Sequence, residues 1–282
     1  MKIKECCFEH RKGKRWIMIP MGEKKMTERQ TQILNIISEE KKVEVIKLAE
    51  LMNVTQVTIR KDLDFLESKG LIRRQHGTAE LDAEDDITNR LAYHYYQKSL
   101  IAAQAAEMIE NGEVVMIESG SCCTLLAEQI VQKRKNVTII TNSVYIANYI
   151  RPATSNNVVL LGGSLLMEPM VTVGPIMCQA ATNFYVDKFY TGTDGFTPNG
   201  YFTGKDIMRV ETIRVMSKQA KKTIILTESN KFSRQGTLAQ FPADDVYAVY
   251  TDTKIPQNVR EYLEEHNVVV NTVDTTKGRE GK

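Results

Sequence analysis

Apolar residues recur every three or four positions in the first third of the chain, whereas short uninterrupted apolar runs dominate the rest. The first pattern predicts amphipathic helices, and the second predicts buried strands of a parallel sheet. Such runs fall at residues 114–118, 137–141, 158–161, 188–191, 223–227, 246–250 and 268–270. Helical patterns fall between most of them, at residues 123–132, 144–149, 207–221 and 256–266. This alternation predicts a doubly wound α/β sheet.

Residues 27–69 carry the pattern of three short helices. Thr27 and Gln30 match a capping box at the start of the first helix. The second helix is expected at residues 45–52, and a tight turn at Asn53 leads into the third. Two helices joined by such a turn predict a helix-turn-helix.

The third helix has one apolar stripe and one polar face. Ile59, Leu63 and Leu66 recur at helical spacing, so we expect them to be buried. The opposite face suits a DNA major groove, because Gln and Arg can form paired hydrogen bonds with base edges, while Thr and Lys suit phosphates. The residues of this helix expected to contact DNA are Thr55, Gln56, Thr58, Arg60 and Lys61.

Residues 71–81 predict a β-hairpin that turns near Gly77. Arg73, Arg74 and His76 precede the turn, and we expect them to lie against the DNA backbone, as the wing of a winged helix does.

One long motif connects these elements to a known family. It consists of Thr58-Ile59-Arg60-Lys61-Asp62-Leu63, Leu66-Glu67, Gly70-Leu71-Ile72 and His76-Gly77. The motif resembles the DNA-binding domain of DeoR-family bacterial transcriptional regulators. Thr78 departs from the family, which usually has a second glycine there, so we expect the wing turn to differ in shape.

Composition restricts the class of protein. A chain of 282 residues with 42% hydrophobic content can bury the cores of two domains. No run approaches the ~20 apolar residues that cross a membrane, and the five cysteines do not form a disulfide framework, which favours a reducing cytoplasm. The four histidines lack metal-ligand spacing, and neither a P-loop nor a Rossmann glycine signature is present. We therefore predict neither a metal site nor a cofactor.

Charge is distributed unevenly along the chain. The net charge is +2, yet residues 1–25 hold eight Lys and Arg against three Glu. This basic leader is either an arm that adds phosphate contacts or a segment upstream of a translation start at Met26, and we favour the second hypothesis. The predicted organisation is a leader at 1–25, a winged helix-turn-helix at 26–81, a linker at 82–89, an α/β effector domain at 90–275 that opens with a helix over 90–111, and a disordered tail at 276–282.

Five polar loops follow predicted strands, and ligands of doubly wound sheets bind at such loops. The amides at the start of the helix after residue 118 suit a phosphate, and Gly162 and Gly163 permit close backbone approach. The carboxylate of Asp194 could accept hydrogen bonds from ligand hydroxyls, and Lys231 could supply a countercharge. The pattern predicts a pocket for a small phosphorylated polyol. Its expected contact residues are Glu118, Ser119, Gly120, Ser121, Cys122, Thr141, Asn142, Ser143, Gly162, Gly163, Asp194 and Lys231.

The same loops resemble the effector domain of the DeoR family. The residues that carry this resemblance are Lys98, Ile101-Ala102, Gly112, Ser119-Gly120-Ser121, Thr141-Asn142-Ser143, Gly162-Gly163, Asp187, Gly195 and Lys231-Phe232. The resemblance implies a sugar-phosphate sensor whose fold is shared with ribose-5-phosphate isomerase and coenzyme A transferases. Glu118 stands where the family commonly has aspartate, and Cys122 and Cys123 stand where threonines are usual, so the identity of the sugar phosphate is open.

The two adjacent cysteines have two interpretations. A thiol at a helix N-terminus can have a lowered pKa and react as a nucleophile or redox sensor. We favour the alternative, in which Cys122 and Cys123 are compact substitutes for threonine.

Two functions are compatible with these patterns. The resemblance favours a repressor of a sugar catabolism or transport operon, which would bind operator DNA as a homodimer or homotetramer under the control of a phosphorylated sugar. The alternative is a sugar-phosphate isomerase-like enzyme with an added DNA-binding domain, in which Glu118, Asp194 or Asp206 would be the base. That alternative gives the N-terminal helices no role.

Overall fold

The structure is a computed structural model that describes residues 26–81, 87–151 and 155–275. The predicted leader at 1–25, most of the predicted linker and the predicted tail at 276–282 lie outside the described residues. The helices are α1 (Glu28–Glu40), α2 (Val45–Leu51), α3 (Gln56–Ser68), α4 (Ile87–Ala92), α5 (Tyr95–Ala106), α6 (Ser121–Lys133), α7 (Val144–Ile150), α8 (Pro175–Ala181), α9 (Ile207–Ser217) and α10 (Gln257–Glu265).

The strands are more numerous than the sequence indicated. They are β1 (Lys42–Glu44), β2 (Arg73–Gln75), β3 (Thr78–Glu80), β4 (Val114–Ile117), β5 (Thr138–Thr141), β6 (Asn157–Leu160), β7 (Ser164–Leu166), β8 (Val171–Val173), β9 (Val186–Thr191), β10 (Gly195–Phe196), β11 (Tyr201–Gly204), β12 (Ala220–Leu226), β13 (Leu238–Pro242), β14 (Ala248–Asp252) and β15 (Val269–Val273). Short 3₁₀ helices, η2 (Ser229–Ser233) and η3 (Ala243–Asp245), lie beside β13 in sequence.

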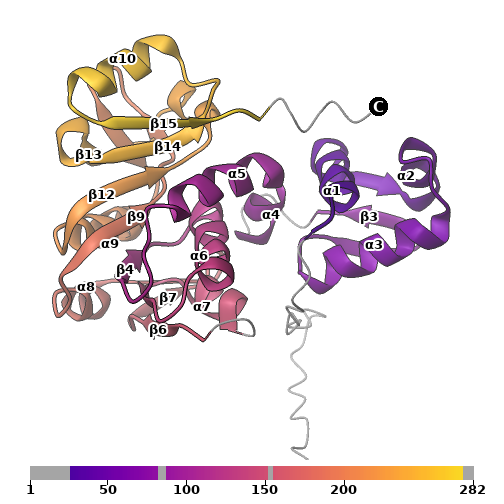
Figure 1. The fold of residues 1–282 in the computed structure, drawn as a ribbon, viewed down its shortest axis with the longest axis horizontal. Helices are drawn as coiled ribbons and strands as arrows, with labels where there is room; N and C mark the ends of the chain where they lie inside the picture. Colours follow the sequence, from indigo (N-terminus) through magenta and orange to yellow (C-terminus); the bar gives the residue numbers. More distant parts are fainter. Residues whose placement is uncertain (1–25, 82–86, 152–154, 276–282) are drawn as a thin grey trace, which may run out of the picture.

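Residues 26–81 form a winged helix-turn-helix (Figure 1). The predicted capping box at Thr27 is present, since the Gln30 amide donates to Thr27 Oγ1 at 3.2 Å and the Thr27 amide donates to Gln30 Oε1 at 2.9 Å. The predicted wing is strands β2 and β3, joined by a two-residue turn in which His76 and Gly77 both have positive φ. Strand β1, which the sequence pattern did not predict, pairs with β3 and closes a small sheet.

The prediction of a single helix over residues 90–111 is wrong. The chain forms α4 and α5 instead, separated by His94 in the left-handed region with φ of 52°. Lys98 Nζ donates to the carbonyls of Arg90 and Tyr93, which the break leaves outside a continuous helix. Residues 87–89, expected in the linker, form the first turn of α4. The break brings the His94 imidazole to Glu228, at 2.6 Å between Nδ1 and Oε1.

The predicted runs at residues 114–270 all become strands of one sheet, with ends shifted by a few residues. Within the described residues this is a seven-stranded parallel sheet of order β15-β14-β12-β9-β4-β5-β6. The chain leaves β4 toward β5 and β6, then returns to the other side of β4 at β9. The boundary between β4 and β9 is therefore the topological switch point, where such sheets bind ligands.

Helices cover both faces of the sheet (Figure 1). Val115 and Ile117 point into the layer of α5, α6 and α7, while Met116 points to α8, α9 and α10. This alternation is the period of two that places successive side chains on opposite faces. The predicted fold class, a doubly wound α/β domain with an N-terminal winged helix, is confirmed.

Two small antiparallel sheets are additions to the predicted architecture. One is the β7–β8 hairpin, and the other has the order β10-β11-β13. Their strands have two to five residues each, too short to give a clear alternation in the sequence. Among the described residues, none of the helices combines the length and the apolar composition needed to cross a membrane.

Candidate functional site

The recognition helix α3 presents the polar face that its sequence predicts. Ile59, Leu63 and Leu66 are fully buried, whereas Gln56, Arg60 and Lys61 are exposed. Among the described residues, the side chains of Arg60 and Lys61 make neither a hydrogen bond nor an ion pair. Two unpaired cations therefore stand on an exposed helix face, as contact with DNA phosphates or base edges requires.

The start of α3 is fixed by Thr55. Its Oγ1 accepts a hydrogen bond from the Thr58 amide at 3.3 Å, and the two hydroxyls lie 3.1 Å apart. A cap of this kind stabilises a helix by about 1 kcal/mol. Thr55 and Thr58 thus hold the first turn, and Gln56 projects from it toward solvent.

The wing residues divide into two groups. Arg73 and His76 are exposed, but Arg74 is half-buried and forms an ion pair with Asp64 of α3. The Arg74 amide also donates to Glu67 Oε1 at 3.1 Å. Arg74 therefore ties the wing to the recognition helix, a contact that the sequence did not indicate.

Two further residues of α3 were missed at the sequence level. Asp62 is 4% exposed and accepts from Arg29 Nε at 2.6 Å and from Gln30 Nε2 at 3.0 Å, which fixes α1 against α3. Val57 is 59% exposed beside Arg60 and Lys61, where an apolar side chain can contact a thymine methyl group. The available sequence signal was the position of Val57 off the apolar stripe that Ile59, Leu63 and Leu66 form.

A cavity of about 970 Å³ lies at the carboxyl ends of β4, β9 and β12. It is placed at the switch point of the sheet. Seven of the twelve expected contact residues line this cavity within the described chain: Glu118, Ser119, Gly120, Ser121, Cys122, Asp194 and Lys231. The sequence thus located the loops after these three central strands.

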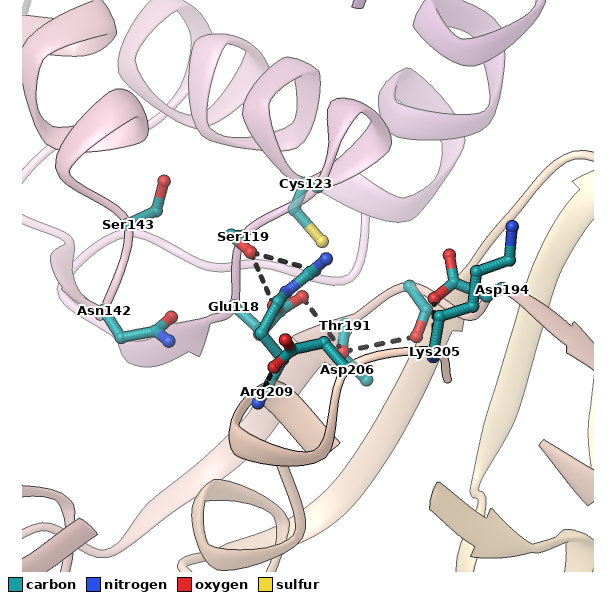
Figure 2. Close-up of polar contacts among 12 residues, drawn as sticks. Glu118, Ser119, Cys123, Asn142, Ser143, Thr191, Asp194, Lys205, Asp206 and Arg209 are labelled. Atoms are coloured by element: carbon teal, nitrogen blue, oxygen red, sulfur yellow. Dashed lines mark hydrogen bonds and ion pairs between the residues drawn. The ribbon is translucent and has the colours of Figure 1, made fainter. Parts of the chain in front are cut away.

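The loops after β5 and β6 do not reach this cavity. Thr141, Asn142 and Ser143 are buried, and the β7–β8 hairpin covers them: the Asn142 Nδ2 donates to the Thr172 carbonyl at 3.0 Å. Ser143 caps α7 by accepting from the Ile146 amide at 3.1 Å. Figure 2 shows Asn142 and Ser143 apart from the group around Glu118.

Gly162 and Gly163 also lie outside the cavity lining. Gly163 does permit a close backbone approach, but to its own chain: a Cβ there would lie 2.7 Å from the Val173 carbonyl oxygen and 2.8 Å from Met177 Cβ. Sequence reasoning foresaw the close approach and could not foresee its partner. The hairpin that displaces these loops has its own turn, residues 166–169, in the cavity wall.

The amino end of α6 faces the cavity as expected. Gly120 is the N-cap residue, so the first amides of the helix have no side-chain cap, and the residues that carry them, Ser121 to Cys123, line the cavity. Free amides and the helix dipole favour an anion at this position.

Lys231 supplies positive charge nearby. Burial lowers the pKa of Lys231, and Asp194 and Glu228 partly oppose that shift. A desolvated ammonium group gains from a bound anion more than an exposed one does. Within the described residues the lining has seven cationic side chains and five carboxylates: Lys41, Arg90, Lys98, Lys205, Arg209, Lys231 and Arg234, against Glu118, Glu168, Asp194, Asp206 and Glu228.

Glu118 is enclosed by donors (Figure 2). Its carboxylate accepts from Arg209 Nη2 at 3.1 Å, from Ser119 Oγ at 2.6 Å and from Thr191 Oγ1 at 3.3 Å, and the residue is 1% exposed. Burial acts to lower the pKa of Arg209, and the charges of Glu118 and Asp194 more than reverse this. The Glu118 carboxylate is therefore already engaged by an arginine and two hydroxyl groups.

Arg209 was not a predicted site residue, because its partner is 91 positions away in sequence. Its Nη2 reaches Glu118 and Ser119, while its buried Nε has no hydrogen-bond partner in the described residues. A buried donor without a partner is costly, so this nitrogen is available to a ligand oxygen. The exposed helix start at Asp206, whose Oδ1 accepts from the Arg209 amide at 2.9 Å, positions it.

A second buried carboxylate, that of Glu228, also lines the cavity. Glu228 contacts His94 Nδ1 at 2.6 Å and Lys98 Nζ at 3.5 Å. Burial would raise the pKa of Glu228, but the hydrogen bond from His94 and the charge of Lys98 hold it below its ordinary value. Lys98, quoted above for the family resemblance, thus lines the cavity with its charge already partly balanced.

Cys122 and Cys123 are both buried. Burial raises the pKa of Cys122 to about 12, and it raises the pKa of Cys123 as well. Thiols with raised pKa are poor nucleophiles, so the geometry favours compact substitutes for threonine over reactive groups.

A winged helix joined to an α/β domain with a cationic cavity defines a ligand-controlled DNA-binding protein. The family described as "DeoR C terminal sensor domain" matches residues 93–253, and the family described as "DeoR-like helix-turn-helix domain" matches residues 29–85. The chain therefore belongs to the DeoR family of transcriptional regulators.

Known relatives agree with this assignment. The HTH-type transcriptional regulator GolR of Listeria innocua is 27% identical over 232 residues, which cover 81% of this chain and 91% of GolR. The glycerol-3-phosphate regulon repressor of Escherichia coli is 28% identical over 247 residues, which cover 86% of this chain and 98% of the repressor. Because the family and these relatives are regulators, the chain is a transcriptional regulator and not an enzyme.

A solved structure of ribose 5-phosphate isomerase from Plasmodium falciparum is also similar in part. It is 15% identical, covers 49% of this chain and 52% of the isomerase, and has a TM-score of 0.37. A likeness of that size supports no inference about activity, and the fold class rests on the strand order of the chain itself.

Proposed function

We propose that this chain is a repressor of a sugar catabolism or transport operon, and that a phosphorylated sugar in the central cavity controls its affinity for operator DNA. The observation that carries the proposal is the pairing, in one chain, of an exposed cationic recognition helix with a cavity built for an anion. The name of the glycerol-3-phosphate regulon repressor of Escherichia coli states that it represses the regulon of a phosphorylated polyol, which supports this class of effector.

The DNA-binding surface is assigned to α3 and the wing. Gln56, Arg60 and Lys61 enter the major groove, while Arg73 and His76 contact the flanking backbone. Thr55 and Thr58 hold the first turn of the helix. Paired winged helices in a homodimer or homotetramer would match a palindromic operator, and a regulator that contacts chromosomal DNA would act in the cytoplasm.

The effector site is assigned to the loops after β4, β9 and β12. The open amides of residues 121–123 and the ammonium group of Lys231 hold the phosphate, and Asp194 accepts hydrogen bonds from sugar hydroxyls. Arg209 offers its unpartnered Nε to another ligand oxygen. Domain boundaries follow as 26–81 for the DNA-binding domain and 87–275 for the effector domain, since α4 packs on α6.

The test is fluorescence anisotropy with labelled DNA from the region upstream of the chain's own operon. Titrations at fixed salt would be run alone and with glycerol 3-phosphate, fructose 1-phosphate, fructose 6-phosphate or ribose 5-phosphate. Specific binding that one phosphosugar weakens is the expected result. Specific binding that no phosphosugar changes would contradict the effector assignment, and absence of specific binding would contradict the regulator assignment at this DNA.

A further inference from the structure

The effector cavity is lined by both domains. Ser38 and Lys41, at the end of α1, and Leu81, after β3, belong to the winged helix, yet they line the same cavity as Lys98 and Lys231. The Leu81 amide donates to the Lys41 carbonyl at 3.2 Å, so the three residues form one connected corner of the DNA-binding domain. A ligand that fills the cavity would therefore touch the domain that binds DNA.

The two domains also share an apolar core. Buried side chains of α1 and α3 belong to the same continuous cluster as those of α4, α5 and α6. Figure 1 shows α1 on the side of the winged helix nearest α4. This packing supports one defined arrangement of the domains.

Helix α6 joins the cavity to the recognition helix. Its first residues, Ser121 to Cys123, line the cavity, and Glu128 lies about two turns further along the same helix. Glu128 Oε1 lies 3.2 Å from Nζ of Lys69, which is the C-cap residue of α3. Helix α6 and one ion pair thus connect the proposed phosphate site, at residues 121–123, to the end of recognition helix α3.

The Lys69–Glu128 pair is buried, with side-chain exposures of 4% and 7%. The Tyr95 hydroxyl donates to Glu128 Oε2 at 3.4 Å, so the carboxylate is held from the effector side as well. Removing one partner of such a pair leaves a buried charge without compensation, which is strongly unfavourable. In the structure the pair links the end of α3 to α6, which is the docked arrangement. A released arrangement, without this contact, would expose both charges to water.

From this geometry we infer that the winged helix senses the effector directly, and that helix α6 with the Lys69–Glu128 ion pair transmits cavity occupation to recognition helix α3. The inference rests on the proposed function, since it names how the same cavity acts on DNA binding. An effector that touches both walls binds the docked arrangement better than the released one, so it shifts the balance between them. Lys69 and Glu128 are positioning residues in this scheme and touch neither ligand.

The experiment measures the coupling factor, which is the ratio of operator dissociation constants with and without a phosphosugar. The probe is the phosphosugar of the four-member panel that changes wild-type operator binding most. The double variant Lys69→Met with Glu128→Met replaces the pair by apolar side chains of similar length, which keeps the site filled without a lone charge. The expected result is a coupling factor reduced by roughly 2- to 30-fold toward unity.

Two further variants separate coupling from folding. The reversed pair, Lys69→Glu with Glu128→Lys, restores opposite charges and is expected to recover the coupling that the apolar pair loses. The matched control is Lys133→Met with Glu107→Met, which removes another ion pair of α6 whose partners both lie in the effector domain. That control is expected to keep the wild-type coupling factor.

Each outcome bears on the inference. A wild-type coupling factor in the apolar double variant, with both ligands still bound, would overturn the inference. An equal loss of coupling in the control variant, Lys133→Met with Glu107→Met, would overturn it too. Failure of the reversed pair to recover coupling would assign a packing role to these residues and would also overturn it. If the wild-type protein itself shows no coupling to any phosphosugar, the proposed function fails instead.

A second experiment tests whether the winged helix contacts the ligand. Lys41→Gln is expected to weaken phosphosugar binding, measured by calorimetry, by roughly two- to fivefold, as for a partly solvated charge. Lys47→Gln is the matched control, because Lys47 belongs to the same domain, pairs with Glu40 and is absent from the described cavity lining. Equal affinities of the two variants would contradict a ligand contact from the winged helix.

Discussion

The recognition helix and the effector cavity both rely on positive charge, but they hold it differently. Arg60 and Lys61 stand exposed on α3 without partners in the described residues. In the cavity, Arg209 is bonded to Glu118 and Lys98 to Glu228. Exposed cations suit a partner that brings many phosphates, whereas balanced buried cations suit a small ligand that must fit one geometry. Removing one charge should therefore have different effects on operator affinity and on phosphosugar affinity.

The largest expected effect is on DNA binding. Arg60→Ala removes an unpaired cation from the proposed DNA-binding face of α3, and the operator dissociation constant should rise by roughly 5- to 150-fold. Far-ultraviolet circular dichroism and phosphosugar binding should be unchanged, because Arg60 is exposed. Arg260→Ala is the control, since Arg260 is partly exposed on α10, far from α3 in sequence, and pairs with Glu264. Retained tight binding in Arg60→Ala would contradict the docking of α3.

The next largest expected effect is on phosphosugar binding. Lys231→Ala removes a partly buried ammonium group from the proposed phosphate site, and the phosphosugar dissociation constant should rise by roughly 10- to 150-fold. Isothermal titration calorimetry measures this directly, with the exposed Lys254→Ala as the control. An unchanged affinity would remove Lys231 from the site.

The affinity of the cavity for a phosphosugar should also depend on pH. Because burial lowers the pKa of Lys231 below 10.5, its charge is lost at lower pH than that of an exposed lysine. Phosphosugar affinity should therefore fall as the pH rises toward 10.5, and Lys231→Ala should abolish that part of the pH profile. A profile that is identical in the variant would contradict the assignment.

Glu228 predicts an effect on stability. Its pKa in the folded protein is lowered below 4.5, so its stabilising contribution is complete above pH 4.5 and is lost as the pH falls through the folded value. Urea unfolding between pH 6 and pH 3 should thus show a shallower loss of stability in Glu228→Gln than in the wild-type protein. Glu261→Gln, an exposed substitution on α10, should follow the wild-type curve.

The smallest expected effect is at the wing. Arg74→Ala breaks the partly exposed ion pair with Asp64, which should cost about 0.2–1 kcal/mol of unfolding free energy. Operator affinity should fall less than in Arg60→Ala, because Arg74 orients the wing and is half-buried. A loss of affinity equal to that of Arg60→Ala would show that Arg74 contacts DNA directly.

Local patterns predicted the frame of the molecule well. The capping box at Thr27, the recognition helix and the strands of the central sheet depend on neighbouring residues, and all three are confirmed. The loop after β4 was foreseen to face the cavity because a strand followed at once by a helix places free amides at the sheet edge.

Contacts between residues that are distant in the sequence could not be predicted from it. Asp62 meets Arg29 across 33 positions, Glu118 meets Arg209 across 91, and His94 meets Glu228 across 134. The loop at Asn142 has the same polar composition as the cavity loops, and the β7–β8 hairpin alone determines that it is covered. Composition therefore identified loops of the right kind, and tertiary packing chose among them.

The central claim is that one chain couples an operator surface to an effector cavity. Coupling is reciprocal, so the operator must change phosphosugar affinity by the same factor as the phosphosugar changes operator affinity. The direct measurement is calorimetric titration of the active phosphosugar into the free protein and into its operator complex, at one salt concentration. Two dissociation constants that differ by the factor found in anisotropy are the predicted result. Equal dissociation constants in the two titrations would contradict the account.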